Sequence, residues 1–302
     1  MKKQVLFLLS ALTFFPINVC AQINPEVEKT LYAIRPEAIK ADMSFLADDM
    51  LEGRRPGTAG FAMASRYVET RFIAMGLQPG VGDSSYVQKV TLKNGTVKED
   101  NSRLSLVIDG KTEALTYGKE FMLSPNPVDL VSEVNAPLIF VGFGVHAPEL
   151  GYSDYGQTDV RDKIIVFFGG APAAFSSAER AYFSSTAVKY QEAVKRGAIG
   201  AISLRLPGGR RFSWDGAVQR SRRGRFRWAN EQDKSQNTFE QLKVIAAFNQ
   251  DHAERLFFRS GKDMATAITN SQAPQSFPLN IEARMKVETT VSRIESSNLI
   301  GV

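Results

Sequence analysis

The fold of this chain is decided by the stretch Leu138-Ile139-Phe140-Val141-Gly142-Phe143-Gly144-Val145. Its aliphatic and aromatic residues follow one another without a polar interruption, which is typical of a strand that is buried on both faces. A second apolar run, residues 163–168, has the same character, and the turn-forming residues 151–156 lie between the two. We therefore expect two strands inside a well-covered sheet.

The residues on either side of this stretch alternate between strand and helix patterns. A helix is predicted at 184–196, with Ala187, Tyr190 and Val194 turned inward. Asp109-Gly110 is a tight hairpin signal. Further strands are predicted at residues 86–92, 104–108, 198–204 and 243–248. This alternation indicates an α/β fold with some α+β character.

Two amphipathic helices are predicted before the first strand. Residues 36–49 form one of them, and the second begins at the N-cap Thr58 and ends at Gly76, with the glycine- and proline-containing turn 51–57 between them. The apolar stripe of the first is Ile39, Met43 and Leu46, and that of the second is Phe61, Ala64, Val68, Phe72 and Met75.

The C-terminal residues have the pattern of strands. Val287, Thr289 and Val291 alternate with polar residues, which indicates a half-buried strand, and residues 298–302 form an apolar strand. No segment that could cover these strands follows them. We therefore expect residues 287–302 at the edge of a sheet whose remainder lies outside this chain.

The N-terminus resembles a secretory signal. Lys2 and Lys3 precede an apolar run, and Val19-Cys20-Ala21 offers a cleavage site after Ala21. A lipoprotein signal with Cys20 as the lipidated residue is the alternative. Removal of residues 1–21 removes the only cysteine, so we expect an exported protein, periplasmic or extracellular, without disulfides. The apolar run is too short to cross a bilayer, and no later segment fits a membrane span.

Positive charge is concentrated in one segment. Between residues 210 and 227 there are seven arginines and a single acid, Asp215. The charge of this segment exceeds the formal net charge of +5 for the whole chain. The segment is expected to be a loop in which the tryptophans are packed and the guanidinium groups of the arginines are solvated or paired with acids. The second interpretation is that the arginines form a patch that binds an anionic partner. An exported protein rarely meets nucleic acid, so nucleic acid is not the expected partner, although Phe212, Trp214, Phe226 and Trp228 interleave with the cations. The arginines are Arg210, Arg211, Arg220, Arg222, Arg223, Arg225 and Arg227.

No catalytic or metal-ligating residue is predicted in this sequence. The two histidines, His146 and His252, lack the spacing of zinc motifs, and nucleophile and phosphate-loop motifs are absent. Gly142-x-Gly144 is interpreted as a strand end with close backbone approach and not as a dinucleotide fingerprint. The carboxylate pairs Asp48 with Asp49 and Asp154 with Asp159 sit where solvated caps and turns are usual.

The order of several motifs carries a resemblance to a known family. Residues 138–145, Gly151-Tyr152-Ser153-Asp154-Tyr155, residues 159–166 and residues 194–202 are similar to the protease-associated (PA) domain of secreted bacterial zinc aminopeptidases, which are related to transferrin-receptor and glutamate-carboxypeptidase-like peptidases. Residues 45–54 and 75–79 resemble the N-terminal segment of that family, and Ser297-Asn298-Leu299-Ile300-Gly301 resembles its return to the peptidase domain.

The resemblance implies a domain plan and a function. Residues 1–21 would be the signal peptide, 22–96 the N-terminal helices and first strand of the peptidase domain, 97–286 an inserted PA domain, and 287–302 the re-entry strands of an incomplete peptidase domain. In the family, the ligands of the two zinc ions follow this point. We therefore expect the N-terminal portion of an aminopeptidase, inactive alone and without a cofactor of its own, whose peptide substrate would need a missing catalytic domain supplied by further sequence or a second polypeptide.

A rival interpretation needs no catalytic domain. The PA domain and its arginine segment would then be a non-catalytic module that binds peptides or an anionic envelope surface.

Overall fold

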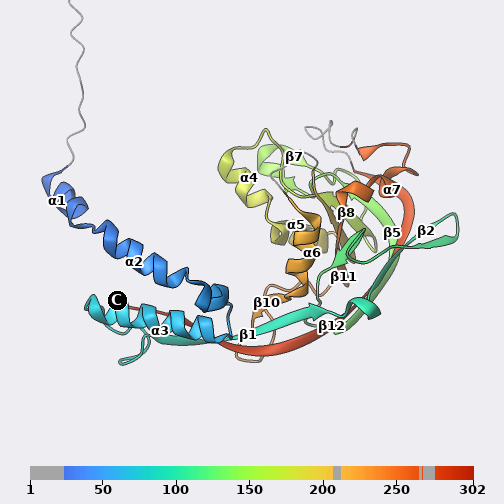
Figure 1. Cartoon of the computed structure of the whole chain (residues 1–302). Coiled ribbons are helices and arrows are strands. Elements are labelled where there is room, and N and C mark those ends of the chain that lie inside the picture. Colours follow the sequence, from blue (N-terminus) through green and yellow to red (C-terminus); the bar gives the residue numbers. More distant parts are fainter. Residues whose placement is uncertain (1–23, 207–211, 265–266, 268–275) are drawn as a thin grey trace, which may run out of the picture. The chain divides into compact units, whose positions relative to one another are not determined.

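The computed structural model describes residues 24–206, 212–264, 267 and 276–302 (Figure 1). The chain forms two compact units, one ending at Ala64 and the other beginning at Ser65. The predicted signal peptide, residues 1–21, lies outside the described residues. The expected boundary at residue 96 falls inside the second unit.

The N-terminal unit is a series of short helices. They are α1 (Pro25–Ala33), α2 (Pro36–Leu46), the 3-10 helix η1 (Asp49–Arg54) and the first residues of α3 (Ala59–Ala74). The side chain of Asp48 accepts the N–H of Met50 at 2.9 Å and so caps η1, as expected for the Asp48 and Asp49 pair. The helix predicted at 36–49 is confirmed but ends at Leu46, and Ile39 and Met43 are exposed on it.

The start of α3 follows its sequence signals. The Thr58 hydroxyl accepts the N–H of Phe61 at 3.3 Å, which confirms the predicted N-cap, and Gly76 takes the left-handed conformation after the helix, at φ +75°. Of the predicted stripe, Ala64 is buried, whereas Met75 is exposed.

The second unit is built on a mixed sheet, which confirms the α/β fold class. The strand order is β10-β1-β12-β5-β8-β9-β11-β4, with β2 paired to β12 and β3 paired to β2. Strands β5, β8, β9 and β11 are parallel to one another, and the other pairs are antiparallel. The strands are β1 (Val87–Val97), β2 (Arg103–Ile108), β3 (Lys111–Ala114), β4 (Phe121–Leu123), β5 (Val131–Val141), β8 (Ile164–Phe168), β9 (Gly200–Leu204), β10 (Arg225–Trp228), β11 (Val244–Phe248) and β12 (Ser276–Leu299).

Short helices and a small second sheet connect these strands. The Asp109-Gly110 hairpin is confirmed, because β2 and β3 are joined by these two residues, both with positive φ. The second sheet pairs β6 (His146–Ala147) with β7 (Tyr152–Ser153). The α-helices are α4 (Ser177–Phe183), α5 (Thr186–Lys195), α6 (Trp214–Arg222) and α7 (Glu254–Phe257), and the remaining 3-10 turns are η2 (Glu99–Asn101), η3 (Pro148–Leu150) and η4 (Gln250–His252).

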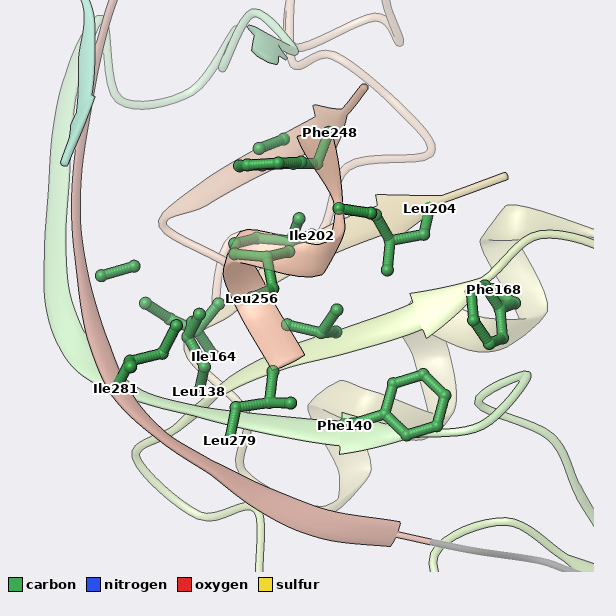
Figure 2. Close-up of a cluster of buried hydrophobic side chains, with 14 of the residues drawn as sticks. Leu138, Phe140, Ile164, Phe168, Ile202, Leu204, Phe248, Leu256, Leu279 and Ile281 are labelled. Carbon is green, nitrogen blue, oxygen red and sulfur yellow. The ribbon is translucent and has the colours of Figure 1, made fainter. Parts of the chain in front are cut away.

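The core confirms that the two apolar runs are buried strands, although β5 ends at Val141 and residues 142–145 leave the sheet. Alternate residues of β5 and β8 supply hydrophobic clusters on opposite faces of the sheet. Ile139 and Ile165 pack under α5 together with Tyr190, whereas Phe140 lies on the other face. Figure 2 shows this second face, where β5, β8, β9, β11, α7 and β12 contribute the side chains. The Phe140 ring lies 5.1–5.2 Å from the rings of Phe168, Phe257 and Phe277.

The C-terminal strands differ from the prediction. Residues 276–299 form one continuous strand, β12, which Figure 1 shows curving through the sheet. Residues 282–286 of β12, which precede the segment expected at an edge, are paired on both sides, with β5 and β2. From residue 289 onward β12 pairs with β1 on one side, and Val97 lies opposite Thr289. The expected boundary at 286 therefore lies inside a strand.

Candidate functional site

The arginine segment is not the loop that the sequence predicts. Arg210 and Arg211 lie outside the described residues, and the remaining residues of the segment form α6 and β10. The Ser213 hydroxyl accepts the N–H of Gly216 at 3.0 Å and begins α6. Trp214 is packed as expected and donates its indole N–H to the Gly118 carbonyl at 2.6 Å, whereas Trp228 is half exposed.

The arginines of α6 and the residues after it have different partners. Arg222 forms a two-pronged ion pair with Glu99, at 2.8 and 3.0 Å, which confirms the expectation of intramolecular pairing for this residue. Arg223 follows at the C-terminal end of the helix, and it also has an interaction partner. Arg220 lines a cavity and has no acidic partner among the described residues.

The two arginines of β10 share one face of that strand. Side chains alternate along a strand, so Arg225 and Arg227 lie on one side and Phe226 and Trp228 on the other. Both guanidinium groups act electrostatically on the hydroxyl of Tyr190, whose pKa burial raises to about 12 against their opposing effect. Burial and the neighbouring charge of Arg225 lower the pKa of Arg227. The fold thus holds these two cations beside a buried phenol.

A cavity of about 360 Å³ lies against these residues. It is formed between α5, α6, β9, β10, β11 and residues 122–125. Arg220, Arg225, Tyr190, Ser203 and Ser221 provide its polar lining, and Leu123, Ala217, Ile245 and Ala246 provide apolar surface. The sequence identified the two arginines but not Ser203 or the hydroxyl of Tyr190, because a strand hydroxyl and an inward helical tyrosine have no sequence pattern that links them to the segment.

A second cluster of ionisable groups surrounds Asp154, which is 2% exposed. One carboxylate oxygen accepts the N–H groups of Phe143 and Val145, at 3.1 and 2.9 Å, and the other accepts the Tyr152 hydroxyl at 2.7 Å. Burial raises the pKa of Asp154 to about 6, and these hydrogen bonds and the charge of Lys189 oppose the shift. Asp159 does not share this site, because it is exposed and accepts the N–H of Arg161.

Lys189 completes this cluster from α5. Its ammonium group donates to the carbonyls of Phe143 and Gly170, and burial lowers its pKa to about 8. The inward face predicted for α5 is correct for Tyr190, but Ala187 is exposed and Lys189 is buried. The hydrogen-bonding atoms of Asp154 and Lys189 are occupied by the fold. This arrangement clamps residues 142–145.

The Gly142-x-Gly144 pattern has the close backbone approach that we expected. Both glycines have positive φ, +52° and +67°. A side chain at position 142 would overlap the Asp154 carboxylate. The glycines therefore serve the clamp around Asp154.

The histidines do not form a metal site among the described residues. His146 Nδ1 lies 3.0 Å from the Ser153 hydroxyl, and His252 lies in the short turn η4. Across residues 24–206, 212–264, 267 and 276–302, no group of three or more His, Cys, Asp or Glu side chains could hold a metal ion. The donor set present there does not fit a zinc centre. In the same residues no helix is long and apolar enough to cross a bilayer.

Comparison with known proteins finds similarity only among solved structures. No protein-family model and no curated protein matches the sequence. The aminopeptidase from Aneurinibacillus sp. strain AM-1 is similar at 19% identity and a TM-score of 0.41, over 87% of this chain and 47% of that one. BSAP, a zinc aminopeptidase from Bacillus subtilis, is similar at 12% identity and a TM-score of 0.33, over 87% and 46%. The chain thus spans about half the length of these structures.

Proposed function

We propose that this chain is the N-terminal, PA-domain-bearing portion of an exported zinc aminopeptidase. In this proposal residues 22–96 and 287–302 belong to the peptidase domain, and residues 97–286 are the inserted PA domain. Two zinc ions and their ligands are contributed by sequence other than the described residues. Export to the periplasm or the exterior is directed by residues 1–21.

The observation that carries this proposal is the place where the chain enters and leaves the middle segment. An inserted domain needs its two ends close together, so that the host domain can continue across the insertion. Val97 and Thr289 are direct partners on adjacent antiparallel strands, and β1 and β12 stay paired from there to Val87 and Leu299. The motifs that resemble the PA domain all lie between these two points. The pairing therefore supports an insertion mounted on β1 and β12.

The proposed role of this chain is to carry the PA domain and not to perform hydrolysis. The resemblance implies that the domain lies over the catalytic cleft and shapes the access of peptide ends. The clamp around Asp154 fits this role, because it fixes the loop at residues 142–145 with hydrogen bonds to buried backbone groups.

The test compares two purified products. The first is the chain alone and the second is the chain extended by the reading frame downstream of its gene, each assayed with leucine p-nitroanilide and added zinc. We expect no turnover by the first and zinc-dependent turnover by the second. Robust turnover by the chain alone, or two zinc ions held tightly by its own side chains, would refute the proposal.

A non-catalytic binding module is the second candidate function. The specific observation in its favour is the arginine-lined cavity, whose lining lies within residues 122–247. This alternative predicts an unrelated gene downstream and a purified chain that is monodisperse and resistant to proteases.

A further inference from the structure

The cavity beside β10 combines positive charge with apolar surface. Arg220 and Arg225 line it from α6 and β10, and Arg227 follows Arg225 on the same face of the strand. Among the described residues no Asp or Glu lines the cavity. Arg222, one position from Ser221 in the lining, is turned to Glu99 instead. An acidic side chain therefore neutralises Arg222, whereas no acidic side chain in the described lining of the cavity neutralises Arg220 or Arg225.

The hydroxyl of Tyr190 is the second observation. Tyr190 is 7% exposed, and its ring is fixed between Phe167 and Phe239, with ring centroids at 6.0 and 5.3 Å. The residue lines the cavity, and within the described part of the chain its hydroxyl has no hydrogen-bond partner. The hydroxyl is open to the cavity and is not one of the buried side-chain atoms that lack a partner, so it is available to donate a hydrogen bond to a ligand there.

The remaining lining indicates the size and chemistry of the occupant. A volume of about 360 Å³ lies within the range of small-molecule sites. Leu123, Ile245 and Ala246 provide apolar surface for the body of a ligand. Guanidinium groups bind carboxylate and phosphate oxygens with paired, charge-assisted hydrogen bonds, and a phenol donates a further one.

We propose that this cavity binds a small organic oxyanion, with its carboxylate or phosphate group at Arg220, Arg225 and the Tyr190 hydroxyl and its apolar body against Leu123 and Ile245. All residues that line the site lie between β4 and β11, so none of them belongs to the segments proposed for the peptidase domain.

The experiment is isothermal titration of the purified chain with N-acetylleucine, with its neutral amide as the matched ligand and inorganic phosphate as competitor. We expect the carboxylate to bind at least about tenfold more tightly than the amide, as charge-assisted hydrogen bonds imply. Competition by phosphate assigns the site to tetrahedral as well as carboxylate oxyanions, and lack of competition assigns it to carboxylates.

Three variants separate a built site from general charge attraction. Arg225→Gln should weaken binding by about tenfold or more, and Tyr190→Phe, which keeps the ring packing, by about threefold or more. Arg222→Gln removes the same charge from a residue outside the cavity and should leave the affinity unchanged. Equal losses in Arg222→Gln and Arg225→Gln, an unchanged affinity in Tyr190→Phe, or no binding of either anion below about 10 mM overturn the proposal.

Discussion

Removing the Asp154 carboxylate is expected to lower the free energy of unfolding by about 3–5 kcal/mol. The N–H groups of Phe143 and Val145 are bound to one oxygen of this side chain, at 3.1 and 2.9 Å. In Asp154→Ala both groups stay buried without an acceptor, at a cost of about 1–3 kcal/mol each, and Lys189 loses the opposite charge beside it. Because domains are stable by only about 5–15 kcal/mol, a loss of this size is readily measured.

Asp154→Asn is the matched control for this prediction. Its amide oxygen can accept the same two N–H groups, and its amide nitrogen can donate to the Tyr152 oxygen, so we expect a loss below about 1.5 kcal/mol. Urea unfolding at pH 7, followed by tryptophan fluorescence, gives both values. The reasoning is refuted if the two variants lose equal stability or if the alanine variant loses less than about 1 kcal/mol.

The same pair of proteins tests the titration of Asp154. Burial raises its pKa from the ordinary 3.8 to about 6. Between these values the native state keeps a proton that the unfolded chain has lost, so the contribution of this group to stability is present below about pH 4 and is lost as the pH rises to about 6. The wild-type free energy of unfolding minus that of Asp154→Asn should therefore fall by about 3 kcal/mol between pH 4 and pH 7. A difference that stays constant or rises contradicts the assignment.

Three further predictions concern backbone space, packing and pairing. Gly142→Ala should destabilise the chain by more than about 2 kcal/mol in urea unfolding. Gly151 also has a positive φ but faces open space, so Gly151→Ala should cost only about 1 kcal/mol. Equal losses would show that the Asp154 carboxylate does not restrict position 142. Trp214→Phe removes the indole N–H that lies 2.6 Å from the Gly118 carbonyl, and it should lower the free energy of unfolding by about 1 kcal/mol. The thermal midpoint measures this loss, and an unchanged midpoint would contradict the contribution of this hydrogen bond. In hydrogen exchange, amides of residues 282–286, which have a strand on both sides, should be better protected than those of 290–299, which pair with β1 on one side, and equal protection contradicts that difference.

The buried strands could be predicted from the sequence because their local composition is compatible only with the interior of the protein. An uninterrupted apolar run is stable only when both of its faces are covered, and residues 164–168 are all buried. The hairpin at Asp109-Gly110 was equally local, since two residues with positive φ define the turn. The N-cap Thr58 needed only its own hydroxyl and the N–H of Phe61.

The features that the sequence did not predict depend on contacts between distant residues. The burial of Lys189 requires the carbonyls of Phe143 and Gly170, which lie 46 and 19 residues away in the chain, and no local pattern announces them. The length of β12 is set by β1, β2 and β5 together, so the boundary that the resemblance implies at residue 286 falls inside this strand. The sequence predicted a loop where the structure has α6. Trp214 at the start of this helix is held by the Gly118 carbonyl, which is almost a hundred residues away and therefore has no signal in the local sequence.

The arginines of the segment have two different roles in the structure, which the sequence alone did not distinguish. Arg222 is neutralised by Glu99 and joins α6 to η2, so its charge serves the fold. Arg225 and Arg227 lie beside the Tyr190 side chain, opposite Gly95 and Lys93 of β1, and the charge of Arg225 lowers the pKa of Arg227. The two cations therefore repel each other. Repulsion of this kind persists in a stable structure only when other interactions offset it. An oxyanion in the adjoining cavity would relieve it, and added N-acetylleucine should therefore raise the thermal midpoint of the wild type more than that of Arg225→Gln.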